Sequence, residues 1–211
     1  SAYDMNINMF NILQHTITGW PGGKPNTDDS FRPERANPEK KRVILFSPHP
    51  DDDVISMGGT FSKLIKQGHD VHVVYQTSGN IAVTDEEALK FAEVSNDFVG
   101  ENSTQINFRA VIDYLNNKSE DQIDSLEVRK LKGLIRRRES FAATRHIGLK
   151  DANIHFLDMP FYETGQIKKN PLGPEDIAIV KEIIAKIKPH QVFAAGDLAD
   201  PHGTHEVCLN A

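Results

Sequence analysis

Two short polar segments carry residue types that bind divalent metal ions. The first, residues 47–53, supplies His49 and Asp52, and the second, residues 196–205, ends at His205. Histidine nitrogen and aspartate oxygen suit zinc, and a catalytic zinc site uses three protein ligands with one position left for water. His49 and Asp52 are three residues apart in a proline-constrained loop, so both can reach one ion. The pattern predicts a zinc site completed by His205, although iron or manganese could use the same ligands.

Two further side chains in these segments suit a hydrolytic reaction. Asp51 stands beside the predicted ligands without being one of them, so its carboxylate can take a proton from an attacking water. His202 precedes His205 by one helical turn and can stabilise an oxyanion and protonate a leaving amine. Together these residues predict a metal-dependent hydrolase with a general base and a general acid.

Each segment also has a plain structural interpretation. A His-Pro-Asp-Asp-Asp loop suits a solvated turn, because aspartate and proline favour turns. His202 and His205, at helical spacing, suit a helix cap or an exposed face. Gly58 and Gly59 do not belong to a phosphate loop, since neither G-x-G-x-x-G nor a Walker sequence is present. The metal site is favoured because the two segments are expected to meet.

That expectation depends on what precedes each segment. Residues 43–46 form a continuous apolar run, as in a strand buried on both faces of a parallel sheet, and residues 191–195 are expected to form a further strand. In open α/β sheets, ligands bind beyond the carboxyl ends of the strands, where the winding direction changes. The two polar segments are therefore expected to lie at the same sheet edge, despite their distance along the chain.

The rest of the chain alternates strand and helix patterns. Further strands are expected over residues 71–75 and 153–157. Helical patterns include residues 55–65, which stop at Gly68, and residues 86–98, 105–115, 126–147 and 174–187. This alternation predicts an α/β fold, a three-layer sandwich in which a mostly parallel sheet has helices on both faces.

Residues 1–41 differ from the rest of the chain. They are polar and interrupted by prolines, which predicts a lead-in segment and linker before one domain over residues 42–211. No apolar run approaches the roughly 20 residues needed to cross a bilayer. The first residues lack the zones of a secretory signal, and the lone Cys208 cannot form an internal disulfide. A cytoplasmic location is therefore expected.

Composition narrows the classes of partner. The chain has 211 residues, of which 26% are charged, and its formal net charge is −6. Its basic residues gather mainly at residues 136–138. A nucleic-acid-binding protein usually carries a far more basic surface. A small molecule, rather than nucleic acid, is the expected partner.

The sequence resembles the LmbE/PIG-L family of zinc-dependent N-deacetylases in three ordered motifs. The family's motif of a small residue followed by His-Pro-Asp-Asp-Glu, with a glycine pair a few residues on, matches residues 48–53 and 58–59. Its Arg-x-x-Glu helix with a Leu-Gly ending matches residues 136–149, and its His-x-x-His motif matches residues 202–205. The resemblance covers the chain from about Lys41 onward.

This resemblance implies a Rossmann-like α/β fold and hydrolysis of N-acetyl groups on glucosamine-containing molecules, so the expected substrate is a small N-acylated amino sugar. It also assigns zinc binding to His49, Asp52 and His205, and the general base to Asp51. The chain is similar as well to the C-terminal portion of fused proteins with an upstream glucosamine-6-phosphate deaminase-like domain. Such a fused or associated domain is an expected partner, and a homo-oligomer is left open.

The sequence departs from the family pattern in three respects. Asp53 stands where glutamate is usual, which shortens a side chain expected to orient the loop. Gly203 and Thr204 replace the common Pro-Asp pair, which removes a carboxylate that could hold and charge His202. Family members continue through another helix and strand, so the domain is expected to extend beyond residue 211.

Five secondary site residues are predicted from their positions. Arg136 or Arg138 could reach a phosphate or hydroxyl of the substrate, or could form a solvated basic face. Asn80 follows a strand and could border the pocket or belong to a turn. Asp53 and Asp200 are expected to support the loops that carry the ligands.

Three functions remain open from the sequence. The first is a zinc N-deacetylase or a broader amidase. The second is a non-catalytic or regulatory domain of a fused glucosamine-6-phosphate deaminase-like protein, although a purely structural site has no use for a base such as Asp51. The third is a phosphoesterase or another metal hydrolase, which a single three-ligand site fits less well than the paired metals common in such enzymes.

Overall fold

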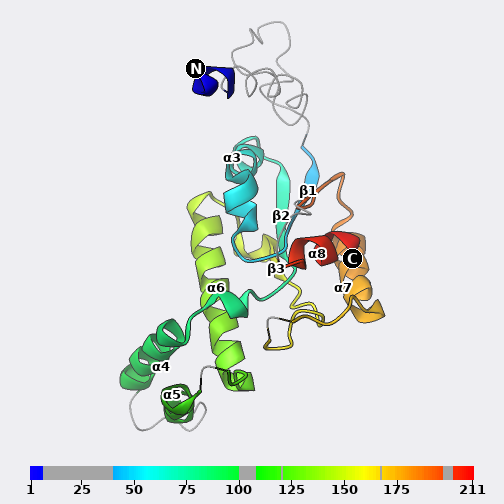
Figure 1. Ribbon diagram of the computed structural model, residues 1–211. Helices are drawn as coiled ribbons and strands as arrows, with labels where there is room; N and C mark the ends of the chain where they lie inside the picture. The colour runs from blue at the N-terminus through cyan, green and yellow to red at the C-terminus, as the bar shows by residue number, and fades with distance from the viewer. Residues whose placement is uncertain (7–39, 100–107, 120, 167, 197–201) are drawn as a thin grey trace, which may run out of the picture.

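The computed structural model describes residues 1–6, 40–99, 108–119, 121–166, 168–196 and 202–211 (Figure 1). Most of the predicted lead-in segment and linker, residues 7–39, lies outside these ranges, as does Asp200.

The described residues contain one sheet of four strands, each parallel to its neighbours, in the order β3-β2-β1-β4. The strands are β1 (Arg42–Ser47), β2 (Asp70–Tyr75), β3 (Ile154–Phe156) and β4 (Gln191–Phe193). β1 and β4 pair directly, with Leu45 opposite Phe193. The chain therefore leaves both strands at the same edge of the sheet, which brings the segments that follow them close together.

Helices cover both faces of this sheet because successive strand side chains point to opposite sides. Val43 and Leu45 of β1 pack with Phe61 and Leu64 of helix α3 (Asp52–Lys66), and Phe141 of α6 (Leu126–His146) lies against the same cluster. On the other face, Ile44 and Val74 pack with Ile183 and Ile187 of α7 (Pro174–Ile187). Figure 1 shows α3 and α6 on the opposite side of the strands from α7. The predicted α/β sandwich is confirmed.

Further elements are η1 (Asn80–Ala82), α4 (Asp85–Val99), α5 (Phe108–Asn117), η2 (Asp151–Asn153) and α8 (Thr204–Asn210). Two bounds differ from the prediction in ways that concern the polar segments. β4 ends at Phe193, two residues early, and α3 begins at Asp52 inside the predicted loop. Carboxylates in the first helical turn interact favourably with the helix dipole, so Asp52 and Asp53 favour this earlier start.

A cluster of four charges ties α4 and α5 to α6. Lys118 and Lys132 each contact the carboxylates of both Asp85 and Asp124, with nitrogen–oxygen distances of 2.5 to 2.8 Å. Lys132 is buried, so this arrangement gives its charge two partners and avoids an unpaired buried ammonium. Within the described ranges, no helix is long and apolar enough to span a membrane.

Candidate metal centre and active site

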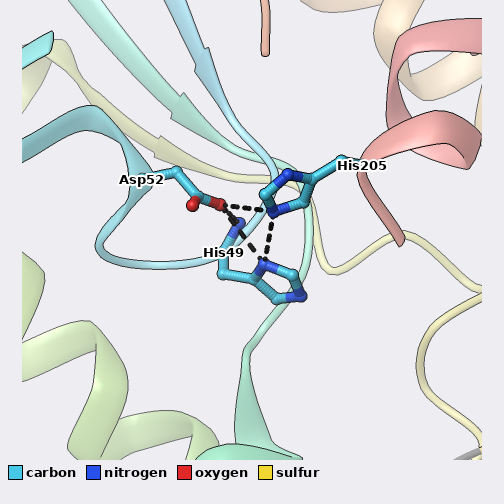
Figure 2. A group of neighbouring side chains, drawn as sticks. All are labelled: His49, Asp52 and His205. Atoms are coloured by element: carbon cyan, nitrogen blue, oxygen red, sulfur yellow. Dashed lines mark hydrogen bonds and ion pairs between the residues drawn. The ribbon is translucent and has the colours of Figure 1, made fainter. Parts of the chain in front are cut away.

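Three side chains from the two polar segments converge on one point (Figure 2). Nδ1 of His49, Oδ2 of Asp52 and Nε2 of His205 form a nearly equilateral triangle, with each pair of atoms 3.2 Å apart. His49 lies in the loop after β1, Asp52 begins α3, and His205 is the second residue of α8. The structure thus brings together the three residues predicted as ligands.

The chemistry of these three atoms fits a divalent metal ion. Two ligands that each lie about 2.0–2.1 Å from a tetrahedral zinc are roughly 3.3–3.4 Å apart. The observed separations of 3.2 Å are close to that value. Two imidazole nitrogens and one carboxylate oxygen suit zinc, and also iron or manganese.

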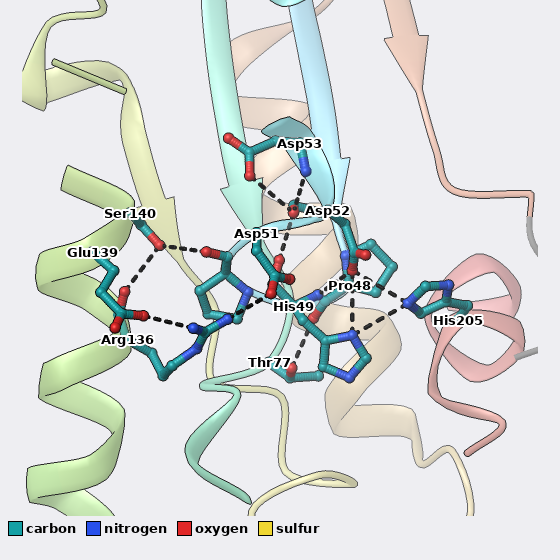
Figure 3. Close-up of polar contacts among 12 residues, drawn as sticks. Pro48, His49, Asp51, Asp52, Asp53, Thr77, Arg136, Glu139, Ser140 and His205 are labelled. Atoms are coloured by element: carbon teal, nitrogen blue, oxygen red, sulfur yellow. Dashed lines mark hydrogen bonds and ion pairs between the residues drawn. The ribbon is translucent and has the colours of Figure 1, made fainter. Parts of the chain in front are cut away.

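The loop that carries His49 is fixed by hydroxyl groups from three elements (Figure 3). The backbone carbonyls of residues 48–50 accept hydrogen bonds in turn from Thr77 Oγ1 at 2.7 Å, Ser47 Oγ at 2.5 Å and Ser140 Oγ at 3.1 Å. Two of these loop residues are prolines and have no N–H, so the loop has few donors for its own turns. The hydroxyls from β1, the β2 loop and α6 therefore set the position of His49.

The Asp52 carboxylate is held in its ionised form. Burial alone would raise its pKa, but hydrogen bonds from the side chain and the backbone N–H of His49, together with the nearby His205, hold the pKa below its usual value. An ionised carboxylate is the form that binds a metal ion.

Asp53 lies beneath the loop, with only 2% of its surface exposed. Its carboxylate accepts a hydrogen bond from the Tyr75 hydroxyl at 3.0 Å and lies 3.4 Å from Ser47 Oγ, and its backbone N–H donates to Ser47 Oγ. Burial raises the pKa of Asp53, and burial together with this carboxylate raises the pKa of Tyr75. Tyr75 therefore stays a neutral donor that links the sheet to the loop.

The predicted base, Asp51, is paired with a cation from α6 (Figure 3). Nη2 of Arg136 donates to Oδ2 of Asp51 at 2.8 Å, and Nη1 donates to Glu139 at 2.6 Å. Arg136 thus lies between two carboxylates, one from the metal loop and one from its own helix. The matching Arg-x-x-Glu spacing in the sequence places these two α6 residues together.

A cavity of about 400 Å³ opens beside the metal centre. Its lining includes His49, Asp51, Arg136, Tyr162, Lys169 and His202. The cavity therefore has two predicted catalytic residues and a predicted ligand in its wall, and it is large enough for a small molecule.

The family model of the GlcNAc-PI de-N-acetylases, PIG-L, matches residues 44–211. The chain belongs to the PIG-L family. This confirms the assignment made from the three sequence motifs.

Two curated relatives extend the comparison. A glucosamine-6-phosphate deaminase-like protein of Bacteroides thetaiotaomicron is 54% identical over 217 residues, which cover 100% of this chain and 33% of that protein. The PIG-L chain therefore spans about a third of the length of this relative. A diacetylchitobiose deacetylase of Thermococcus kodakarensis is 45% identical over 47 residues, 22% of this chain and 18% of its own length.

Among solved structures, the N,N'-diacetylchitobiose deacetylase of Pyrococcus horikoshii aligns over 97% of this chain and 56% of its own, with a TM-score of 0.49 and 21% identity.

The structure places the other predicted residues of this PIG-L domain at different distances from the site. Arg136 lines the cavity, whereas Arg138 lies against Phe141, with its guanidinium carbon 5.4 Å from the ring centre, and lines a separate hollow. Two residues along a helix correspond to a rotation of about 200°, so both arginines cannot face one cavity. The prediction that Arg138 reaches the substrate is not supported by this placement.

Asn80 and His202 also differ from expectation. Asn80 is buried in η1 and donates through Nδ2 to Oε2 of Glu163 at 3.1 Å, so it braces the cavity wall rather than lining it. His202 lines the cavity, but it lies in the turn before α8 and not within the helix. α8 begins only at Thr204, because Gly203 adopts a left-handed conformation with φ of 68°.

Several residues of this site carried no recognised signal in the sequence. Thr77 lies two residues after the end of β2, so the strand-end rule that identified His49 could have indicated it. Ser140 lies one helical turn from Arg136 and could have been found with the α6 motif. Tyr162 and Lys169 lie in a loop without periodic pattern, and no local signal predicts that they meet His49.

Gly79 is required where two loops of the PIG-L domain approach. Its φ is +64°, and a Cβ atom there would lie 2.6 Å from Cδ of Pro50 in the metal loop. We expect Gly79→Ala to lower the free energy of unfolding by about 1–3 kcal/mol and to weaken metal binding, because the metal loop must shift. Urea unfolding and metal titration measure both effects.

The matched control is Gly59→Ala in α3, where a new Cβ meets nothing within 4 Å. That change should leave the free energy of unfolding unchanged or raise it by up to about 1 kcal/mol, since alanine favours helix. Wild-type stability and metal affinity in Gly79→Ala would contradict the close approach.

Proposed function

We propose that this chain is a metal-dependent N-deacetylase that acts on an N-acetylated amino sugar. The observation that carries the proposal is the convergence of His49, Asp52 and His205 beside a cavity that Asp51 also lines. Membership of the PIG-L family supports the reaction type. The names of the deacetylase relative and of the longer deaminase-like relative support an amino-sugar substrate.

In this proposal His49, Asp52 and His205 hold zinc, which when bound polarises the amide carbonyl and lowers the pKa of water. Asp51 accepts a proton from the attacking water as the new C–O bond forms. His202 lines the same cavity and donates a proton to the amide nitrogen as the C–N bond breaks. The products are acetate and a free amine.

Arg136 positions the base in this scheme. Its contact with Oδ2 of Asp51 fixes the carboxylate and leaves the second carboxylate oxygen to take the proton. The contact joins α6 to the metal loop, so the base is oriented before the substrate arrives.

The longer relative suggests the setting of this activity. Because the chain spans about a third of that protein, the deacetylase would work beside a sugar-phosphate deaminase-like domain, fused to it or associated with it. Its product, an amino sugar with a free amine, is the chemical class on which such a domain acts.

The test is amine release by the full-length protein from N-acetylglucosamine derivatives. Turnover should be lost after removal of metal with a chelator and restored by zinc, because the water and carbonyl then regain their activation. A parallel addition of magnesium controls for ionic effects, since Mg²⁺ prefers an all-oxygen octahedral site. Full turnover by the chelated protein would contradict metal dependence, and a metal-loaded protein without turnover would favour a non-catalytic domain.

A further inference from the structure

A second cationic side chain, Lys169, lines the cavity that Arg136 borders. Its ammonium nitrogen lies 4.2 Å from the centre of the Tyr162 ring and donates a hydrogen bond to the backbone oxygen of Gln166 at 3.1 Å. Its neighbour Lys168 is exposed. One lysine of the pair is thus held at the cavity and the other faces solvent.

The loop that carries Lys169 is built to hold this position. The backbone N–H of Asn170 donates to the carbonyl of Phe161 at 3.0 Å and closes the loop over residues 161–170. Thr164 Oγ1 lies within hydrogen-bond distance of the carbonyl oxygens of Gln166 and Lys168, at 3.2 and 3.1 Å, and accepts from the backbone N–H of Gln166. Phe161 and Tyr162 are buried at its base. These contacts of the described loop residues place the ammonium at the cavity.

The two cations of the cavity differ in their charge partners. Arg136 contacts the carboxylates of Asp51 and Glu139, so its charge is already compensated. Lys169 contacts a neutral ring and a neutral carbonyl, and no carboxylate in the described part of the chain lies within ion-pair distance of it. An ammonium has three N–H donors, so these contacts leave capacity for a ligand.

Partial burial adds to this difference. Burial lowers the pKa of Lys169, and the charge of Glu163 offsets only part of that effect. An anion placed beside the ammonium would stabilise the charged form that burial disfavours. Of the two cationic side chains, Lys169 therefore gains more from a bound anion.

Tyr162 connects this cation to the metal centre. Its ring centre lies 5.9 Å from the ring centre of His49, in an edge-to-face arrangement. The same ring lies 4.2 Å from the ammonium. These two short distances keep Lys169 within the span of a single substituted sugar from the metal centre.

We propose that Lys169 forms an anion subsite, and that the substrate is an N-acetylated amino sugar bearing an anionic substituent such as a phosphate. This inference rests on the proposed deacetylase function and adds a substrate class to it. The acetamide would lie at the metal centre and the anion at Lys169, so the same cavity would bind both substituents of the sugar.

The test compares amine release from N-acetylglucosamine 6-phosphate, N-acetylmuramic acid and N-acetylglucosamine by the full-length, metal-loaded protein. The first two carry a phosphate and a carboxylate, and the third is neutral. Lys169→Met should raise KM for the preferred anionic sugar by about 10- to 100-fold with little change in kcat, because a charge-assisted hydrogen bond is lost. KM for the neutral sugar should not change. Lys169→Arg should restore much of the loss, and Lys168→Met, the matched exposed control, should behave as wild type.

Equal effects of Lys169→Met on anionic and neutral sugars would overturn the subsite, as would a wild-type preference for the neutral sugar. Calorimetric binding of N-acetylglucosamine 6-phosphate separates this proposal from the proposed function. If no sugar is turned over but Lys169→Met weakens binding at least tenfold, the subsite stands and the deacetylase function fails. If binding is equal in both proteins, the subsite falls whatever the turnover.

Discussion

Asp51→Asn should lower kcat by roughly 10²- to 10⁴-fold while the protein keeps its metal. Asparagine preserves the shape of the side chain but cannot take a proton near neutral pH. The loss should appear in kcat, with little change in KM, because the missing interaction belongs to the transition state. The measurement is amine release at matched metal occupancy.

The fold should survive this change. The substitution also removes the ion pair between Asp51 and Arg136. The Asp51 side chain is 43% exposed, and ion pairs with such exposure contribute about 0–1 kcal/mol to the free energy of unfolding. A fall of several orders of magnitude in kcat therefore cannot come from unfolding. Asp97→Asn, on the exposed face of α4, makes the same change in net charge far from the cavity and should leave kcat unaltered. Equal rates for wild type and Asp51→Asn would refute the assignment of the base.

His205→Ala and His49→Ala should each weaken zinc binding by more than about 100-fold. Loss of an outer-shell partner alone typically costs roughly 10- to 100-fold in metal affinity, and these changes remove a ligand itself. His202→Ala provides the contrast, because it lowers kcat but should change metal affinity by less than about tenfold. Competition with a chromophoric zinc chelator measures the affinity of each variant.

The measurement must exclude metal bound at a second pair of histidines. Nδ1 of His72 and Nε2 of His155 lie 3.0 Å apart, and burial lowers the pKa of His155 to about 4. The His155 ring is therefore neutral at neutral pH, which is the form of histidine that binds metal. Titrations in a His155→Leu background count only the metal at His205 and its partners. Wild-type affinity in both ligand variants would disprove the ligand set.

The elements of this protein were predictable where one physical pattern dominates. The continuous apolar run at residues 43–46 became β1, because strands buried on both faces are rich in apolar residues, and the strand expected at residues 71–75 became β2. α7 has the predicted bounds, which Pro174 at its first turn favours. The approach of His49 to His205 followed from the strand-end rule alone.

The parts of the site that were not predicted depend on packing between distant segments. The partner of Asp51 is Arg136, 85 residues away, and helical periodicity does not say whether Arg136 or Arg138 faces the sheet edge. Lys169 reaches the cavity only because its loop closes onto Phe161 and Tyr162. Such contacts are set by tertiary structure, for which a single sequence carries no local signal.

The segments that carry the three metal ligands differ in how firmly they are held. We therefore expect the ligands to meet the ion in a defined order. His49 lies on a loop fixed by hydroxyls from three elements and Asp52 begins the 15-residue α3, whereas His205 is carried by the seven-residue α8 that follows the three-residue β4. Short elements with few buried apolar contacts open locally at lower free energy than a central sheet. We expect an arriving ion to meet a two-ligand half-site first and to be captured when α8 docks. Release should take place in the reverse order. The rate at which α8 opens, rather than the rate at which the domain unfolds, should therefore set the residence time of the ion.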